Sequence, residues 1–476
     1  MRSSVTAVLP GLLLAMLLGA LDQTIMTPAL PSIAADLGGL AQMPAVVTAY
    51  LVAATVVMPV YGKLGDRFGR KPVMQAAIAV FVAGAVLCAM AASMPQLVAF
   101  RALQGMGGGG LMIGAQAIIG EIVSPRERGR YLGFIGAAYV VAAVGGPLLG
   151  GFFVDRLSWR WIFAVYPPLG LVAFVLLTLT LHLPRPARAT ATESGTAAWP
   201  PVDYAGTLTL AAAVLGIVLL GQTRHPAWLL LALAGGAAWF LTARRAADPV
   251  LPLRLFRDPA FAVPVAISFL IGFALFGTLT YLPSYLQIAL GAGAAQAGLV
   301  VTALMAGVLL TTVVSGRLIT RTGRYKPYPI AGTALAAAGL ALLAVLAAAS
   351  RGVASLAPGT AVAALSAAMA VIGLGVGLVM QVMVLATQNA VGYADLGAAT
   401  SSVTFLRQIG ASAGVAVAGT LITWRLESGL PEAAALGAAM PLVFGLMAPL
   451  LGVAFVLAVA LPVRPLRTTA HVKEPA

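Results

Sequence analysis

Charged residues are scarce in this chain of 476 residues: they make up 9% of it, against about 25% in an ordinary soluble protein. So little charge cannot cover a water-exposed surface, which excludes a soluble globular protein. One cysteine, Cys88, excludes an internal disulfide. There are three histidines, and we find no HExxH motif, no paired acids and no nucleophile–base pair. The sequence therefore predicts no metal site, no cofactor and no enzyme.

Apolar runs of about 20 residues recur along the chain, and 61% of its residues are hydrophobic. Each run is long enough, at 1.5 Å per residue, to cross a hydrocarbon core roughly 30 Å thick. We predict an all-α polytopic membrane protein with fourteen spans, an even number that places both termini on one side. These spans lie at 6–27, 44–62, 72–92, 96–119, 131–151, 161–181, 204–222, 227–243, 261–283, 297–316, 329–349, 360–384, 400–422 and 441–462. The first span lacks a convincing cleavage site and is expected to stay uncleaved.

The net charge of +14 could indicate nucleic-acid binding, but the basic residues lie in short loops between apolar runs. Most of them fall in the loops on the side of the two termini, among them Arg67, Arg126 and Arg321. Because loops rich in Lys and Arg stay in the cytoplasm, both termini are predicted to be cytoplasmic. Arginine far outnumbers lysine, as in GC-rich bacteria. We therefore expect a multi-pass protein of the bacterial inner membrane.

Two basic loops resemble each other: residues 62–72 (GKLGDRFGRKP) and residues 316–327 (GRLITRTGRYKP). Both follow an apolar span on the same side, which indicates two parallel repeated halves around a midplane site. More spans separate the loops than six-helix halves require, so we infer an inserted hairpin. The predicted segments are an N-terminal bundle (1–182), a cytoplasmic connector (183–203), the hairpin (204–243), a second connector (244–260), a C-terminal six-helix bundle (261–462) and a cytoplasmic tail (463–476).

Asp22 is the only acidic residue that we place well inside a predicted span. A charge at the bilayer centre costs at least about 2.5–3.5 kcal/mol on insertion scales, so this side chain needs a cavity or a partner. Removal from water disfavours the charged form of a carboxyl group, which suits Asp22 to bind and release a proton. We predict that it couples transport to a proton gradient; the alternative is a fixed structural hydrogen bond.

Arg101 is the cationic counterpart, about one turn into the predicted span 96–119. Arginine stays protonated in proteins, so it also needs a partner. It could act on Asp22 through a direct pair, through water or through its field alone. The alternative is a structural cation that binds backbone carbonyls where helices pack.

Two further motifs indicate moving parts. Gly146, Pro147, Gly150 and Gly151 allow close helix packing and a kink in one span, as in a pivot, although ordinary packing would need the same residues. In the first basic loop, glycines permit a tight turn, and Asp66 can cap a helix or pair with a basic residue. We predict a latch that closes the inner side, with an orientation signal as the alternative. Its residues are Gly62, Asp66, Arg67, Gly69 and Arg70.

A cavity for a small organic molecule needs aromatic and neutral polar side chains on several helices. With Asp22 the only deep acid, one cationic group on the ligand could be tolerated, and strong recognition of an anion is not expected. The candidate lining residues, most of which could equally pack between helices, are Gln23, Tyr50, Gln116, Tyr139, Phe273, Phe276, Tyr281, Gln287, Gln381, Gln388, Asn389 and Phe405.

At these motifs the chain resembles the major facilitator superfamily, specifically its fourteen-helix drug–proton antiporter branch (EmrB/QacA type). The resemblance rests on residues 21–31, 62–71, 97–109, 133–151, 158–163 and 400–410. Ala142 stands where a glycine is usual, and Tyr166-Pro167 where Asn-Pro is common. The resemblance implies two six-helix bundles plus an inserted hairpin, alternating access, and efflux in exchange for protons, with Asp22 and Arg101 in the coupling role.

We therefore predict a proton-driven monomeric exporter of small lipophilic or monocationic organic compounds, including drugs. Its partners are the substrate, protons and membrane lipids, and no nucleic acid. One alternative is an exporter dedicated to a single metabolite or lipid. A membrane-embedded enzyme is a remote alternative, because the chain carries no catalytic constellation.

Overall fold

The computed structural model describes residues 5–39, 42–183, 203–223, 225–349, 358–427, 429 and 431–468. Over these residues it is all-helical, and each of the fourteen predicted spans corresponds to a long helix. These helices are α1 (Val5–Ile25), α3 (Met43–Phe68), α4 (Arg70–Ala89), α5 (Met94–Ile122), α6 (Pro125–Arg156), α8 (Tyr166–Thr180), α9 (Tyr204–Thr223), α10 (Ala227–Arg245), α11 (Pro259–Leu279), α13 (Ala294–Thr322), α14 (Pro327–Ala348), α16 (Pro358–Ala390), α17 (Leu396–Leu426) and α18 (Glu432–Ala460).

Short helices connect some of the long ones: η1 (Thr27–Ala29), α2 (Leu30–Leu37), α7 (Trp161–Ala164), η3 (Leu253–Arg257), α12 (Leu282–Ser284), η4 (Tyr285–Ala289) and η5 (Tyr393–Asp395). In the described part of the chain, thirteen helical stretches are long and apolar enough to cross a membrane. The remaining predicted span is α5, a helix of 29 residues. Its four consecutive glycines, 107–110, make it less apolar than the others.

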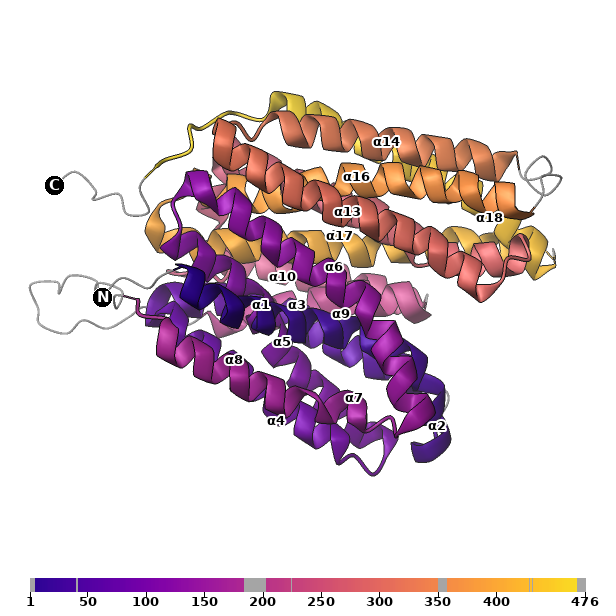
Figure 1. Cartoon of the computed structure of the whole chain (residues 1–476), viewed down its shortest axis with the longest axis horizontal. Coiled ribbons are helices and arrows are strands. Elements are labelled where there is room, and N and C mark those ends of the chain that lie inside the picture. The colour runs from indigo at the N-terminus through magenta and orange to yellow at the C-terminus, as the bar shows by residue number, and fades with distance from the viewer. Residues whose placement is uncertain are drawn as a thin grey trace, which may run out of the picture.

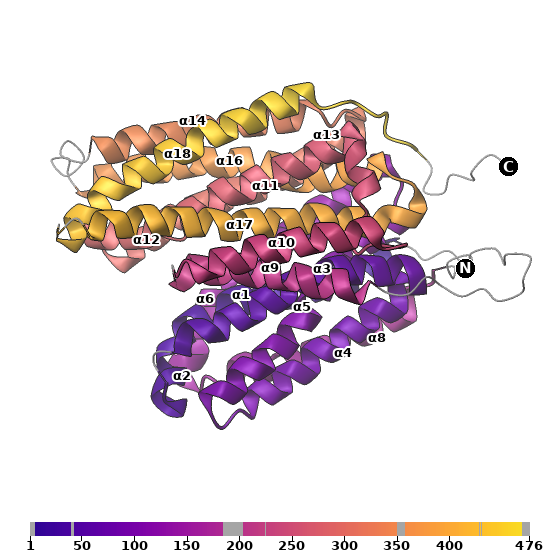
Figure 2. The same cartoon turned by 180° about the vertical axis from the view of Figure 1, so that it is seen from behind.

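The helices form two bundles, one from α1 to α8 and one from α11 to α18 (Figures 1 and 2). The bundles lie close together at the end where α1 begins and α18 ends, and they diverge toward the opposite end (Figure 1). We call these ends the termini side and the far side. Between the bundles, α3 packs against α17, and α6 packs against α13. The two contacts correspond to each other, because α3 and α13 carry the two copies of the basic motif and each packs against a helix of the other half.

The hairpin of α9 and α10 packs against both bundles, through contacts of α9 with α3 and α17. Its sequence is plain and apolar, and Gly216 and Gly235 let its two helices approach closely. On the termini side, Lys63 of α3 forms an ion pair with Asp248, just after α10. Residues 184–202 of the predicted connector and residues 469–476 of the predicted tail lie outside the described residues.

The first basic loop is not a loop in the structure. Helix α3 continues through it to Phe68, and α4 begins at Arg70, so that Gly69 alone separates the two helices. Gly69 has a φ of 95°, a backbone conformation that favours glycine. The prediction of a glycine turn over residues 62–69 was therefore wrong, because the apolar run ends before the helix does. Gly62 is a helical residue whose missing side chain makes room for Ser401 of α17.

Candidate functional site

The centre of the N-terminal bundle holds a buried ion pair. Arg101 Nη1 of α5 donates a 2.6 Å hydrogen bond to Asp22 Oδ2 of α1. The side chains are 1% and 0% exposed, respectively, so neither charge reaches water in this conformation. Asp22 lies in the last turn of α1, and Arg101 lies about two turns from the start of α5. The end of α1 and the start of α5 both lie on the far side. Of the three modes considered from the sequence, the structure shows the direct pair.

Gln104 completes this pair and was not predicted from the sequence. Its Nε2 donates to Asp22 Oδ1 at 3.0 Å, and its Oε1 accepts from Arg101 Nη1 at 2.8 Å. Both oxygens of the Asp22 carboxylate are therefore engaged. Gln104 lies three residues after Arg101, on the same face of α5. This spacing is the sequence feature from which its role could have been predicted.

Aromatic side chains enclose the pair. The guanidinium carbon of Arg101 lies 4.4 Å from the ring centroid of Tyr50 and 5.8 Å from that of Phe163. A cation over an aromatic face is stabilised by the ring quadrupole, more strongly when water is absent. The Tyr50 hydroxyl donates to Gly19 O of α1 at 3.2 Å. Tyr50, predicted to line the substrate cavity, is thus part of the wall around the ion pair.

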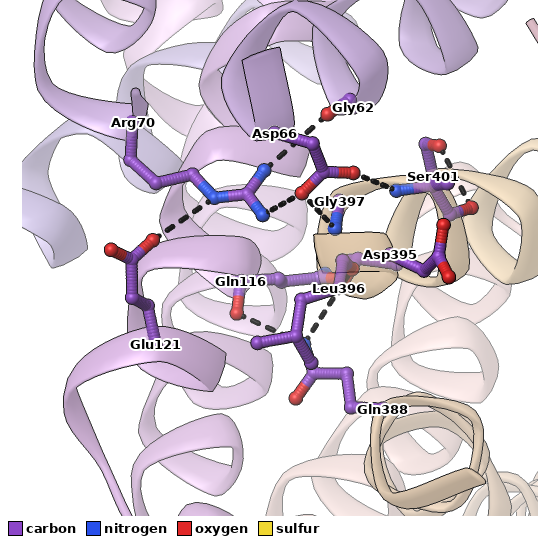
Figure 3. Close-up of polar contacts among 12 residues, drawn as sticks. Gly62, Asp66, Arg70, Gln116, Glu121, Gln388, Asp395, Leu396, Gly397 and Ser401 are labelled. Carbon is purple, nitrogen blue, oxygen red and sulfur yellow. Dashed lines mark hydrogen bonds and ion pairs between the residues drawn. The ribbon is translucent and has the colours of Figure 1, made fainter. Parts of the chain in front are cut away.

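A second polar cluster joins the two bundles on the termini side (Figure 3). Asp66, at the end of α3, accepts hydrogen bonds from the backbone N–H groups of Gly397 and Ala398, both at 2.9 Å. These are the first amides of α17, so a carboxylate from one half caps a helix of the other half. The N-terminus of a helix carries a partial positive charge, which stabilises an anion there.

Arg70 holds Asp66 in this position. Its guanidinium forms an ion pair with Asp66 and a second one, at 3.2 Å, with Glu121 of α5 (Figure 3). It also donates to Gly62 O at 3.4 Å. The guanidinium carbon of Arg67, the other arginine of the motif, lies 5.2 Å from the ring centroid of Phe68. Asp66 and Glu121 lie near the ends of α3 and α5 on the termini side. Asp22 lies in the last turn of α1 and is enclosed inside the N-terminal bundle.

The second copy of this motif makes a different contact. Arg126, near the start of α6, donates to Thr320 O at 3.4 Å and to Arg321 O at 3.3 Å, both on α13. The Thr320 hydroxyl, which stands where the first copy has Asp66, donates to Gly316 O of its own helix. The α6–α13 contact therefore lacks the carboxylate cap of the α3–α17 contact.

The glycines of α6 pack this helix against α1, next to Asp22. A side chain at position 146 would collide with Thr24 Oγ1, and one at position 150 with Ile25 O. Thr24 Oγ1 also donates to Ala142 O of α6 at 2.9 Å. Gly151 has no neighbour within contact distance, and Pro147 is exposed within the unbroken helix. Gly146 and Gly150 thus bring α6 close to the segment that carries Asp22.

The order of these features along the chain matches one family of transporters. Residues 12–415 match the model described as "Major Facilitator Superfamily". The chain belongs to the major facilitator superfamily. Two solved superfamily structures share its fold. They are the human organic anion transporter MFSD10 (TETRAN), with a TM-score of 0.67 and 15% identity over 96% of this chain and 100% of that chain, and the proton:xylose symporter XylE, with a TM-score of 0.66 and 18% identity over 96% of each.

Several curated superfamily members are similar in sequence. An uncharacterized MFS-type transporter of Mycobacterium tuberculosis (strain ATCC 25618 / H37Rv) is 40% identical over 440 residues, which cover 90% of this chain and 61% of that protein. Two proteins of Bacillus subtilis (strain 168) are also similar. Multidrug transporter protein MdtP is 34% identical (89% of this chain, 76% of that protein), and Multidrug resistance protein 3 is 30% identical (89% and 80%). The chain thus spans about three fifths of its mycobacterial relative. The family match and the apolar helices identify a multi-pass membrane protein of the major facilitator superfamily.

The predicted cavity residues of this transporter do not form one group. One set lies where the bundles meet: Gln388 of α16 donates to Gln116 O of α5 at 3.1 Å, and Gln381 and Tyr139 lie in the same interface. A second set lies on or just after α11: Phe273 packs against Gly414 and Phe269, Tyr281 donates to Val415 O at 3.3 Å, and Phe276 is half-buried.

The remaining candidates lie elsewhere. Gln23 of α1 donates to Met112 Sδ at 3.4 Å, inside the N-terminal bundle. Asn389 donates to Arg464 O at 3.1 Å, on the termini side. Gln287 is exposed in η4, and Phe405 is buried in α17. The interface between the bundles is therefore the part of the predicted cavity that draws residues from both halves.

Proposed function

We propose that this superfamily member exports small lipophilic organic molecules across the bacterial inner membrane in exchange for protons. It belongs, in this proposal, to the fourteen-helix drug–proton antiporter branch, and both termini lie in the cytoplasm. The relatives named as multidrug transporters support the export of varied organic compounds. The basic loops on the termini side support the orientation.

The enclosed pair of Asp22 and Arg101 is the observation that carries the proposal. A carboxylate in a water-poor site is stable there because the guanidinium neutralises it, and protonation of Asp22 removes that attraction. Arg101 stays charged and must then find other partners, for which Gln104 and the Tyr50 ring lie in reach. Proton binding at Asp22 would thus alter how α1 and α5 are held together.

Contacts around Asp22 connect this change to the bundles. Thr24, two residues after Asp22, is bound to Ala142 of α6. Helix α6 in turn packs against α13 of the other half, with Gly129 and Gly316 in direct contact. A displacement of α1 therefore acts on the helix that joins the halves. In alternating access, such a displacement opens one side while the Asp66 contact with α17 closes the other.

The driving force is sufficient for export. One proton that enters down a potential of 100 mV supplies about 2.3 kcal/mol. At roughly 1.4 kcal/mol per tenfold ratio, this supports about a fiftyfold concentration of a neutral substrate when one proton is exchanged per molecule. The expectation of a monocationic substrate depends on a free carboxylate, and the Asp22 oxygens are both engaged here. The proposal is therefore restricted to lipophilic molecules.

Transport of the variant Asp22→Asn tests the proposal. An accumulation screen in a pump-deficient bacterium first supplies an exported compound. In inverted proteoliposomes, we expect a pH gradient to drive uptake of this compound by the wild type and not by Asp22→Asn, while exchange of the compound without a gradient persists. Asp36→Asn, which changes a carboxylate that is 49% exposed at the far side, is the matched control. Gradient-driven uptake by Asp22→Asn at the wild-type rate would refute the proposal.

A further inference from the structure

Arg407 of α17 is a buried cation for which the described residues supply no ion-pair partner. The residue is 8% exposed, and its Nη1 lies away from solvent with no hydrogen-bond acceptor in reach. Across the described ranges of the chain, no carboxylate forms an ion pair with it. It lies near the middle of α17, which runs from Leu396 to Leu426, and therefore at membrane depth rather than at a helix end.

The other buried arginines of this transporter are neutralised or bonded. Arg101 has Asp22, and Arg70 has Asp66 and Glu121. Arg128, on the termini side, donates to Val123 O at 3.0 Å. An arginine inside a membrane protein is costly unless it meets a partner, a backbone carbonyl or a water-filled space. Among the described residues, Arg407 has no ion-pair partner and donates to no backbone carbonyl. Its position therefore points to a partner that is not part of the protein.

The surroundings of Arg407 place it between the two halves. Gly272 of α11 packs against its backbone and Cγ, on the side of its own bundle. The phenol of Tyr139, which belongs to α6 in the other half, is the titratable group near the Arg407 side chain. Gln381 of α16 packs against Gly136 of α6, one turn before Tyr139. Arg407, Tyr139 and Gln381 thus surround one region of the interface from three helices.

This region also has unused hydrogen-bonding capacity. Gln381 is 7% exposed, and its Oε1 has no hydrogen-bond partner within the described residues. This oxygen accepts hydrogen bonds, so a bond from Gln381 to an anion has to come from its Nε2 group. A guanidinium, a phenol and an amide can all donate hydrogen bonds to a carboxylate, and an arginine can do so with two parallel bonds. The carboxylate of Asp22, enclosed in the N-terminal bundle, is occupied by Arg101 and Gln104.

We propose that Arg407 binds the carboxylate of an otherwise lipophilic substrate at the interface between the halves, with Tyr139 and Gln381 as further donors. This inference rests on the proposed export function and specifies its substrate class as amphiphilic organic anions. Strong recognition of an anion was not expected from the sequence, in which Asp22 was the one deep acid and Arg407 was given no role. Helix α17 extends beyond the predicted span 400–422 at both ends, from Leu396 to Leu426, and Arg407 lies well inside it.

Binding of a matched set of probes to the purified transporter tests this proposal. 1-Pyrenebutyrate, its amide and pyrenebutyl-trimethylammonium share one apolar body and differ in the charge of one group. We expect the carboxylate to bind more tightly than the amide, and the ammonium to bind most weakly. Arg407→Gln should weaken carboxylate binding by at least about tenfold and leave the amide unchanged, because a hydrogen bond to a charged group is lost. Arg407→Lys should retain part of the preference.

Arg425→Gln is the control, since it removes the same charge from the last turn of the same helix. Unchanged binding of the amide shows that each variant is folded. The proposal would be overturned if the wild type bound the carboxylate no better than the amide, or not measurably. It would also be overturned if Arg407→Gln preferred the carboxylate as strongly as the wild type does. Binding at zero pH gradient does not require proton coupling. Failure here therefore leaves the exchange mechanism intact, and gradient-driven uptake by Asp22→Asn at the wild-type rate, which would refute that mechanism, leaves this result intact.

Discussion

Arg101 neutralises Asp22 through a 2.6 Å hydrogen bond between two helices that are 79 residues apart at these positions. The pair is enclosed by the N-terminal bundle, not by the interface between the halves. In the proposed mechanism, proton binding and substrate binding are therefore separated in space. The proton acts within one bundle, and the substrate binds near Arg407, between the halves. Coupling between them has to pass through helix contacts, of which α1–α6 and α6–α13 are the direct ones.

Loss of one partner of the buried pair should be more harmful than loss of both charges. Arg101→Leu leaves an uncompensated carboxylate in a site without water, which costs about 3–5 kcal/mol in comparable pairs. We expect a marked decrease in the Tm of the purified protein. Adding Asp22→Asn to Arg101→Leu removes the stranded charge and should restore part of the Tm. Equal Tm values for the single and double variants would contradict this interpretation of the pair.

The contact of Asp66 with α17 should stabilise the conformation in which the termini side is closed. Hydrogen bonds to a charged group are worth about 1.5–3 kcal/mol each, and Asp66 accepts two from the first amides of α17. Asp66→Ala should therefore increase the population in which the ends of α3 and α17 are far apart. Distances between spin labels at these helix ends, measured by double electron–electron resonance, report this population.

Thr320→Ala is the matched control at the repeated motif, because the Thr320 hydroxyl is bonded within its own helix. It should leave the distance distribution of the wild type unchanged. If Asp66→Ala also had the distance distribution of the wild type, the Asp66 carboxylate would not hold the two halves together.

Glycines 146 and 150 should be intolerant of even one methyl group. Gly146→Ala and Gly150→Ala place a Cβ against Thr24 and Ile25 of α1, and overpacking of this kind costs typically about 1–3 kcal/mol. We expect a lower Tm and slower transport for both variants. Gly145→Ala and Gly151→Ala change neighbouring glycines that have nothing in contact distance, and they should behave as the wild type. Similar Tm values for all four variants would refute the close contact with α1.

The sequence was sufficient for the spans and for the two residues of the buried pair. Apolar runs predict membrane helices because the bilayer requires them, and Asp22 and Arg101 stand out because charges within such runs are rare. The repeated basic loops indicated two parallel halves, and the family resemblance implied two six-helix bundles with an inserted hairpin. The fold match confirms this arrangement, whereas the roles of the individual site residues remain predictions.

Other features could not be read from the sequence because they depend on contacts between distant residues. Asp66 meets Gly397, which lies 331 residues away, and no spacing rule predicts such a pair. The apolar pattern ends at Gly62 although α3 continues to Phe68, since hydropathy reports the membrane and not the hydrogen bonds of the helix.

Substrate-driven proton movement tests the exchange mechanism most directly. Proteoliposomes loaded with an exported compound and the pH indicator pyranine are diluted into medium without the compound, at equal pH on both sides and with the potential clamped. As the compound leaves, the wild type and Asp36→Asn should acidify the lumen, and Asp22→Asn should not. Lumen acidification by Asp22→Asn at the rate of the wild type would contradict the assignment of the exchanged proton to this carboxyl group.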